Sequence, residues 1–164
     1  MRALFLCLLA MMLRWLAQGN MKPKIVAAVV FGLATFGVSY SALHAQTART
    51  VWDGVYSDEQ ASKGEALYGQ HCASCHGGSL EGGDVPPALA GADFLSNWNG
   101  LTVGDLFERI RITMPLDKPQ TLSRDVNAAI LAYMFKVNKF PAGKDALPGQ
   151  TEVLKQIQIV AKKE

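Results

Sequence analysis

The sequence predicts an all-α fold of three to five helices joined by loops, and three observations favour this class. Apolar residues recur at helical spacing after Thr102 and again after Ser123. Short polar side chains that can cap a helix stand where each of these stretches begins. The segment between the predicted helices is rich in glycine and proline, and no section of the chain reads as strand-rich. With 49% apolar residues in 164, the chain can bury the core of one domain plus an extra segment.

The first predicted helix runs from Asp58 toward His71. The side-chain oxygen of Ser57 or Asp58 can satisfy free N–H groups in its first turn. Residues 77–99 follow it and contain the runs GGSLEGG and VPPALAG. Such runs are typical of loops, so a loop is expected there.

Two further helices complete the expected set. One helix is predicted over residues 103–112, directly after Thr102. Another is predicted over residues 124–140, directly after Ser123, and the proline at position 141 stops it. Residues 151–161 are expected to be weakly helical or extended.

The first 45 residues are predicted to be a leader with a secretory signal, and Met21 is an alternative start. Two lysines and an apolar run over residues 25–38 precede Ala45, a plausible cleavage point. A retained membrane anchor is the alternative, because the apolar character extends to Leu43 with few interruptions. We therefore expect a periplasmic protein, with a membrane-anchored form as the alternative.

The charge balance excludes one class of partner. Four of the 16 basic residues lie in the leader, so residues 46–164 carry 12 basic and 14 acidic side chains. Nucleic-acid-binding domains carry a basic excess, so no nucleic acid partner is expected.

The most informative motif is Cys72-Ala-Ser-Cys75-His76, because the remaining cysteine, Cys7, lies in the leader. A disulfide is one interpretation in an oxidising compartment. A thioredoxin-type pair is another, but it needs a βαβ context that the sequence lacks. Zinc is a poor fit, since no second cysteine pair is present. We favour a different interpretation, covalent attachment of a c-type haem, for which Cys-x-x-Cys-His is the signature. The two thiols add to the vinyl groups on one edge of the porphyrin, which directs His76 at the iron.

Three side chains are candidates for the second iron ligand. Met114 follows a predicted helix and precedes Pro115, so an irregular loop can present its thioether. Its position alone leaves core packing equally open. Met134 lies inside an apolar helical pattern and is expected in the core, and His71 is expected on the surface.

The segments GEALYGQHCASCHGGSLEGG, PPALAG, TMP and ILAYMFKVNKFPAG together resemble a class I c-type cytochrome over residues 53–143. The resemblance is closest to the monohaem cytochromes associated with quinoprotein alcohol dehydrogenases of Gram-negative bacteria. It implies the class I fold around one covalently attached haem c. It also implies thioether bonds at Cys72 and Cys75, with His76 and Met114 as the iron ligands.

The resemblance implies further contacts. The backbone carbonyl of Pro87 is expected to accept a hydrogen bond from the ring of His76, and Trp98 or Asn99 to donate to a haem propionate. The first and last helices are expected to cross near Gly64, Tyr68 and residues 131–133. Residues 46–143 then form the cytochrome domain, and residues 144–164 a C-terminal tail outside the family pattern.

Iron held by a histidine and a methionine is closed to substrate, so the resemblance implies one-electron transfer rather than catalysis. We expect a periplasmic carrier that takes electrons from a dehydrogenase of the quinoprotein type, as a free protein or as a subunit of its complex. It would pass them to a terminal oxidase or another cytochrome. The alternatives are a haem peroxidase-like enzyme with an open distal side and a haem-based sensor with a labile sixth ligand. Carbon monoxide binding to the reduced protein distinguishes these alternatives from the carrier.

Overall fold

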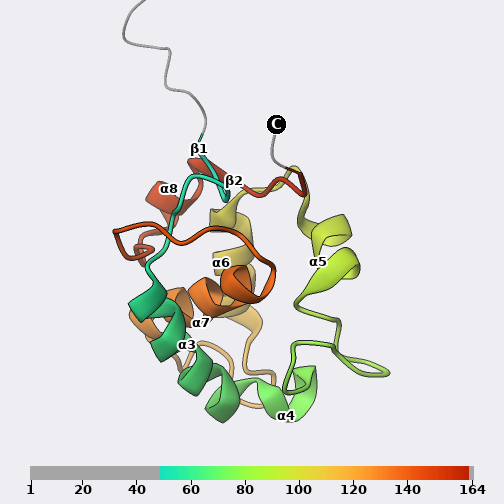
Figure 1. The fold of residues 1–164 in the computed structure, drawn as a ribbon. Helices are drawn as coiled ribbons and strands as arrows, with labels where there is room; N and C mark the ends of the chain where they lie inside the picture. Colours follow the sequence, from blue (N-terminus) through green and yellow to red (C-terminus); the bar gives the residue numbers. More distant parts are fainter. Residues whose placement is uncertain (1–48, 163–164) are drawn as a thin grey trace, which may run out of the picture. The chain divides into compact units, whose positions relative to one another are not determined.

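The computed structural model describes residues 49–162, and the predicted leader lies outside the described residues. Six helices and one two-stranded sheet follow in the order β1 (Arg49–Thr50), α3 (Asp58–His71), α4 (Ala73–His76), α5 (Gly91–Trp98), α6 (Val103–Thr113), α7 (Arg124–Val137), α8 (Thr151–Leu154) and β2 (Ile157–Gln158) (Figure 1). The all-α prediction is confirmed, with one short helix more than the predicted three to five. In residues 49–162, no helix combines the length and apolar character needed to cross a bilayer.

The three predicted helices begin at their predicted caps. The side-chain oxygen of Ser57 accepts from the N–H of Gln60, and that of Ser123 accepts from the N–H of Val126. Thr102 forms a reciprocal capping box with Asp105, in which each side chain accepts from the other residue's backbone N–H. These caps satisfy backbone donors that would otherwise lack a partner at the start of each helix.

Helix α7 ends three residues earlier than predicted. The N–H of Asn138 donates to the carbonyl of Met134 and closes the last turn of the helix. The next residue, Lys139, adopts a φ of +66°. A positive φ takes the backbone out of the helical region, so the chain turns away after Val137. This turn carries Phe140 back to the core, where it is buried.

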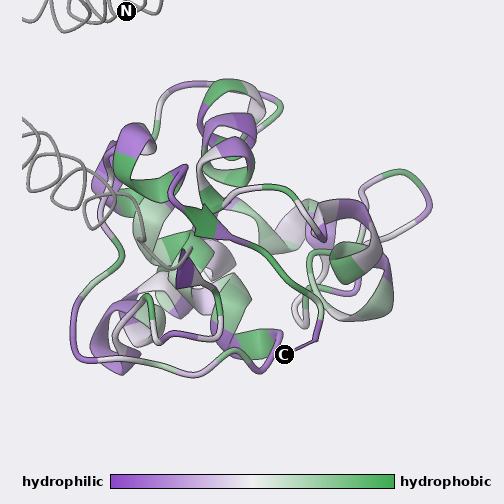
Figure 2. Ribbon diagram, turned by 90° about the horizontal axis from the view of Figure 1, so that it is seen from above, coloured by the Kyte–Doolittle hydropathy of each residue, from purple (hydrophilic) through white to green (hydrophobic). Residues whose placement is uncertain are grey.

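Helices α3 and α7 cross at Gly64 and lie side by side in Figure 1. A Cβ atom on Gly64 would lie 1.8 Å from the carbonyl oxygen of Ala129, so only a glycine permits this approach. One turn later, the rings of Tyr68 and Tyr133 pack with their centroids 5.5 Å apart. Helix α3 buries one face, whereas α7 is buried on all sides over residues 127–132. Figure 2 shows hydrophobic and hydrophilic residues along the helical ribbons of the domain.

Helix α5 corrects the prediction that residues 77–99 form one loop. Gly91 enters the helix with a φ of +81°, and its N–H donates to the side-chain oxygen of Asn138, 3.0 Å away. Phe94 is fully buried in the common core, with Leu95 and Trp98 packed against it. The helix therefore depends on tertiary burial, which the glycine and proline content of the segment does not reveal.

The segment predicted as a tail, as far as residue 162, packs on the rest of the domain. Strands β1 and β2 pair in parallel, with Arg49 opposite Ile157. The indole N–H of Trp52 donates to the carbonyl of Val160 at 3.0 Å. The amide side chain of Gln60 forms two hydrogen bonds with the backbone of Leu147. Four side chains of the segment are fully buried: Leu147, Leu154, Ile157 and Ile159.

Candidate haem-binding site

The Cys-x-x-Cys-His motif forms a single tight turn at the end of α3. Cys72 ends α3, and its N–H donates to the carbonyl of Tyr68 at 2.8 Å. The carbonyl of Cys72 in turn accepts from the N–H groups of Cys75 at 3.1 Å and His76 at 2.9 Å. The three side chains that could contact a haem, those of Cys72, Cys75 and His76, therefore all come from a single turn. Helix α3 fixes the position at which this turn begins.

Both cysteines are free thiols, so the structure gives the disulfide alternative no support. Cys75 is exposed, whereas Cys72 is half-buried. Burial, with a smaller contribution from Cys75, raises the pKa of the Cys72 thiol to about 11. Cys72 is therefore a protonated thiol at neutral pH and a weak nucleophile on its own.

His76 is buried and oriented by a backbone carbonyl. Its Nδ1 lies 2.9 Å from the carbonyl oxygen of Pro87. A carbonyl can only accept, so Nδ1 carries a proton, and in the neutral ring Nε2 has the free lone pair. A histidine in this tautomer can bind a metal through Nε2, because the contact fixes the ring orientation and the tautomer.

The loop between His76 and Pro87 turns back on itself to make this contact. The N–H of Gly82 donates to the carbonyl of His76 at 2.8 Å, and the N–H of Leu89 donates to the carbonyl of Leu80 at 2.8 Å. Leu80 is fully buried and pins the loop to the core. Pro87 is thereby held beside the histidine by backbone hydrogen bonds rather than by chance proximity.

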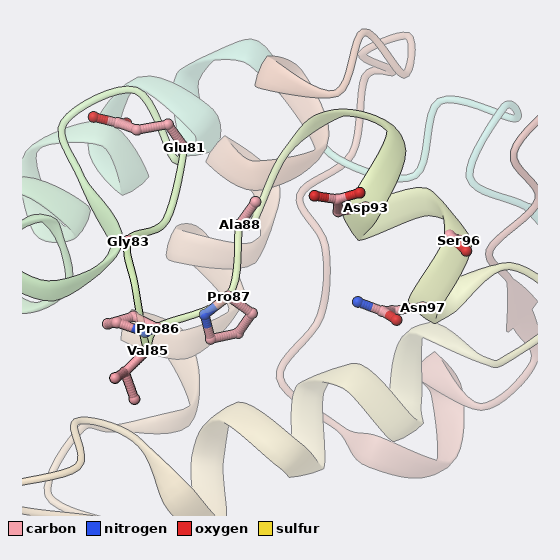
Figure 3. Close-up of a pocket in the computed structure, with 9 residues that line it drawn as sticks. All are labelled: Glu81, Gly83, Val85, Pro86, Pro87, Ala88, Asp93, Ser96 and Asn97. Carbon is pink, nitrogen blue, oxygen red and sulfur yellow. The ribbon is translucent and has the colours of Figure 1, made fainter.

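A cavity of about 350 Å³ opens beside Pro87, between the loop and α5 (Figure 3). Its walls are Glu81, Gly83, Val85, Pro86, Pro87 and Ala88 on the loop, and Asp93, Ser96 and Asn97 on α5. None of these lining residues is basic. Ser96 and Asn97 were missed in the sequence because their segment was predicted as a loop. Their spacing from Asp93, three and four residues, is the signal that a helix would place all three on one face.

Met114 directly follows the last residue of α6 and is its C-cap. Its N–H donates to the carbonyl of Ile110 at 2.9 Å, and its backbone is extended, with φ −119° and ψ 153°. The side chain is half-buried, and Pro115 behind it is buried. Met134 is buried in the core of α7, as expected. His71, the last residue of α3, is half-buried.

The two candidates for a propionate contact differ in their surroundings. Trp98 is half-buried at the end of α5 and packs against the core. The side-chain oxygen of Asn99 accepts from the N–H of Ala161 at 2.8 Å, so this residue also ties the C-terminal segment to α5. Their roles toward a propionate, like those of the ligands, stay predictions.

The residues present fit a haem c. Two free thiols and an oriented imidazole stand on one turn, which is the donor set that thioether attachment and axial ligation require. Among residues 49–162 no group of three or more histidine, cysteine and acidic side chains could hold a metal ion, so the zinc alternative has no support there.

Comparison with known proteins supports the same cofactor. The family model of the cytochrome c oxidase, cbb3-type, subunit III matches residues 59–134, which contain the whole motif and Met114. Comparison with curated proteins finds no match. Among solved structures, a chain of the sulfane dehydrogenase SoxCD from Paracoccus pantotrophus is 29% identical, with a TM-score of 0.45. That similarity covers 70% of this chain and 61% of the other, so this chain spans less than two-thirds of its length. Residues 59–134 are similar to a c-type cytochrome domain, and a domain of this type carries haem c.

Proposed function

We propose that this cytochrome is an electron carrier that accepts one electron from a dehydrogenase and delivers it to another redox protein. Haem c, when bound, supplies reversible one-electron exchange at its iron. The observation that carries the proposal is the contact between His76 Nδ1 and the Pro87 carbonyl, 2.9 Å long. A histidine held in one tautomer by a backbone contact is suited to permanent ligation rather than to proton transfer.

We assign the attachment to Cys72 and Cys75, and the axial ligands to His76 and Met114. The extended backbone of Met114, immediately behind α6 and before Pro115, supports the second ligand. Pro115 has a fixed φ, so the loop loses little entropy when the thioether is held. With a protein ligand on each side, no position is left open for a substrate, which favours a carrier over a peroxidase-like enzyme or a sensor.

We propose a dehydrogenase, of the quinoprotein type, as the electron donor and an oxidase or second cytochrome as the acceptor. The matched family model is named for an oxidase subunit, which supports an oxidase on the acceptor side. The charges favour a basic partner surface, because residues 64–108 contain six acidic residues and no lysine or arginine. Glu81 and Asp93 line the cavity next to Val85, which is 90% exposed. An exposed apolar side chain among carboxylates is suited to a small, transient interface.

We also propose that the chain acts in the periplasm after removal of residues 1–45. The lysines, apolar run and small residues before Ala45 support export. Intact-mass measurement of the native protein tests it. A mature chain that begins near Gln46 is expected, and a chain that keeps residues 25–38 and stays with the membrane would replace this proposal with an anchored carrier.

The carrier is tested by replacing Met114. Met114→Ala should abolish the sulfur-to-iron charge-transfer band of the oxidised protein, lower the reduction potential and let the reduced protein bind carbon monoxide. Met134→Leu is the matched control. It should leave all three readouts unchanged and cost less than about 1.5 kcal/mol in stability, since it conserves volume in the core.

Two outcomes would contradict the proposal. Ready carbon monoxide binding by the reduced wild type would favour the enzyme or sensor alternatives. If both variants kept the wild-type band and potential, the sixth ligand would not be a methionine, and the closed carrier would lose its chemical basis.

A further inference from the structure

One residue, Tyr68, contacts the backbone at both ends of the haem-binding segment, residues 72–77, which contains the Cys-x-x-Cys-His motif. Its carbonyl accepts from the N–H of Cys72 at 2.8 Å. Its hydroxyl donates to the carbonyl of Gly77 at 2.6 Å. Cys72 opens the motif and Gly77 directly follows His76, so one residue of α3 holds both ends of the segment that carries the proposed axial ligand, one end through its backbone carbonyl and the other through its hydroxyl.

The position of the Tyr68 ring is fixed by its surroundings. The side chain is 2% exposed and packs against the ring of Tyr133 on α7. Gly64, one turn earlier, lets the backbone of α7 approach α3 closely, which brings Tyr133 against the Tyr68 ring. Burial raises the pKa of the Tyr68 hydroxyl, which therefore stays a hydrogen-bond donor across the whole physiological range.

The accepting carbonyl belongs to a residue with an unusual backbone. Gly77 has φ +79° and ψ 156°, a conformation essentially restricted to glycine. Within residues 49–162, its carbonyl accepts from the Tyr68 hydroxyl and from the N–H of Leu80, the latter at a distance of 3.4 Å. The Tyr68 hydroxyl is therefore the stronger of the two contacts that hold the chain where it reverses after His76.

We propose that Tyr68 is a positioning residue for the iron ligand His76. Its hydroxyl fixes the peptide that follows the histidine, while the Pro87 carbonyl fixes the ring itself. Together they set the angle of the imidazole plane about its bond to the iron. This inference rests on the proposed role of His76 as an axial ligand.

The domain contains a matched control for the loss of such a hydrogen bond. Tyr56 is 1% exposed, and its hydroxyl donates to the carbonyl of Phe140 at 2.7 Å. The two tyrosines thus share burial, bond type and bond length, but Tyr56 contacts no residue of the haem-binding segment in these hydrogen bonds. A purely structural role of Tyr68 predicts that both hydroxyls have the same effect.

The experiment compares Tyr68→Phe with Tyr56→Phe in the haem-loaded protein. Each should lower the equilibrium constant for folding by about tenfold, as expected for one buried hydrogen bond. Only Tyr68→Phe should change the spread of the haem methyl proton shifts in the oxidised protein, which reports the orientation of the histidine plane. It should also shift the reduction potential. Unchanged methyl shifts and potential in Tyr68→Phe, with a stability loss equal to that of Tyr56→Phe, would overturn the proposal.

A second substitution keeps the test decisive if Tyr68→Phe fails to load haem. Incorporation of 4-aminophenylalanine at position 68 restores a hydrogen-bond donor at the end of the ring. Restored haem loading and wild-type methyl shifts support the proposal, whereas failure of this variant as well overturns it. The wild-type spectrum tests the premise separately. If it lacks the hyperfine-shifted signals of an iron-bound histidine, the assignment of His76 fails, whatever Tyr68 does.

Discussion

Gly64→Ala should destabilise the domain strongly, because this glycine lies where α3 and α7 cross. The added Cβ atom would lie 1.8 Å from the carbonyl oxygen of Ala129 and 2.5 Å from its carbonyl carbon. Cβ atoms essentially never approach heavy atoms closer than 3.0 Å, so the helices must separate locally by about 1.2 Å. The obstacle is backbone and cannot rotate away. We expect a loss of about 3 kcal/mol, at the upper end for overpacked cores, and a fall of about 10 °C in Tm.

The same helix supplies the control. Gly69 is exposed on α3, and a Cβ atom there would meet nothing within 4 Å. Gly69→Ala should raise stability by about 0.5 kcal/mol, because alanine favours a helix over glycine. Thermal and denaturant unfolding of both haem-loaded variants checks the pair. The reasoning is refuted if Gly64→Ala is as stable as the wild type, or if the two substitutions shift Tm in the same direction by similar amounts.

Two further predictions concern charge. Hydrogen bonds from Arg111 and Thr151 lower the pKa of Glu108 to about 2 from its ordinary 4.5. The ionised carboxylate therefore stabilises the fold fully above about pH 4.5, and this stabilisation is lost as the pH falls toward 2. Glu108→Gln should therefore cost about 1 kcal/mol at pH 7 and progressively less below pH 4.5, as measured by denaturation across this range, and a pH-independent difference would contradict it. Oxidation of the reduced protein by tris(phenanthroline)cobalt(III), a cation, should slow as salt is added, whereas oxidation by hexacyanoferrate(III), an anion, should accelerate. Glu81→Gln with Asp93→Asn should weaken this salt dependence more than Asp145→Asn, and equal effects would argue against an acidic docking surface.

The elements that the sequence predicted well are those defined by local chemistry. Ser57, Thr102 and Ser123 each accept a hydrogen bond from an N–H group three residues later, so a helix start is encoded in a few adjacent residues. Helix α5 was missed because its stability comes from the burial of Phe94 and from the contact of Gly91 with Asn138, 47 residues away. Local composition carries no signal of such contacts.

In the candidate site, too, the features encoded by adjacent residues were predicted well, and those that depend on tertiary contacts were not. The motif from Cys72 to His76 is contiguous, so its chemistry could be inferred directly from the sequence. The contact between His76 and Pro87 was predicted only through the family resemblance, since nothing in the spacing of eleven residues requires it. The hydroxyl contact of Tyr68 and the docking of the C-terminal segment on Gln60 were not predicted. Both depend on how the chain folds back on itself, which no residue pattern specifies.

Covalent attachment of the haem tests the central claim most directly. The measurement is the intact mass and absorbance of the native protein after denaturation and extraction with acidic organic solvent. Haem should stay with the wild-type chain. Cys75→Ser should keep one thioether bond and show a shifted spectrum in the reduced form. The double replacement of Cys72 and Cys75 by serine should lose all covalent haem. Extraction of the haem from the wild-type chain, or its retention by the double variant, would contradict the account.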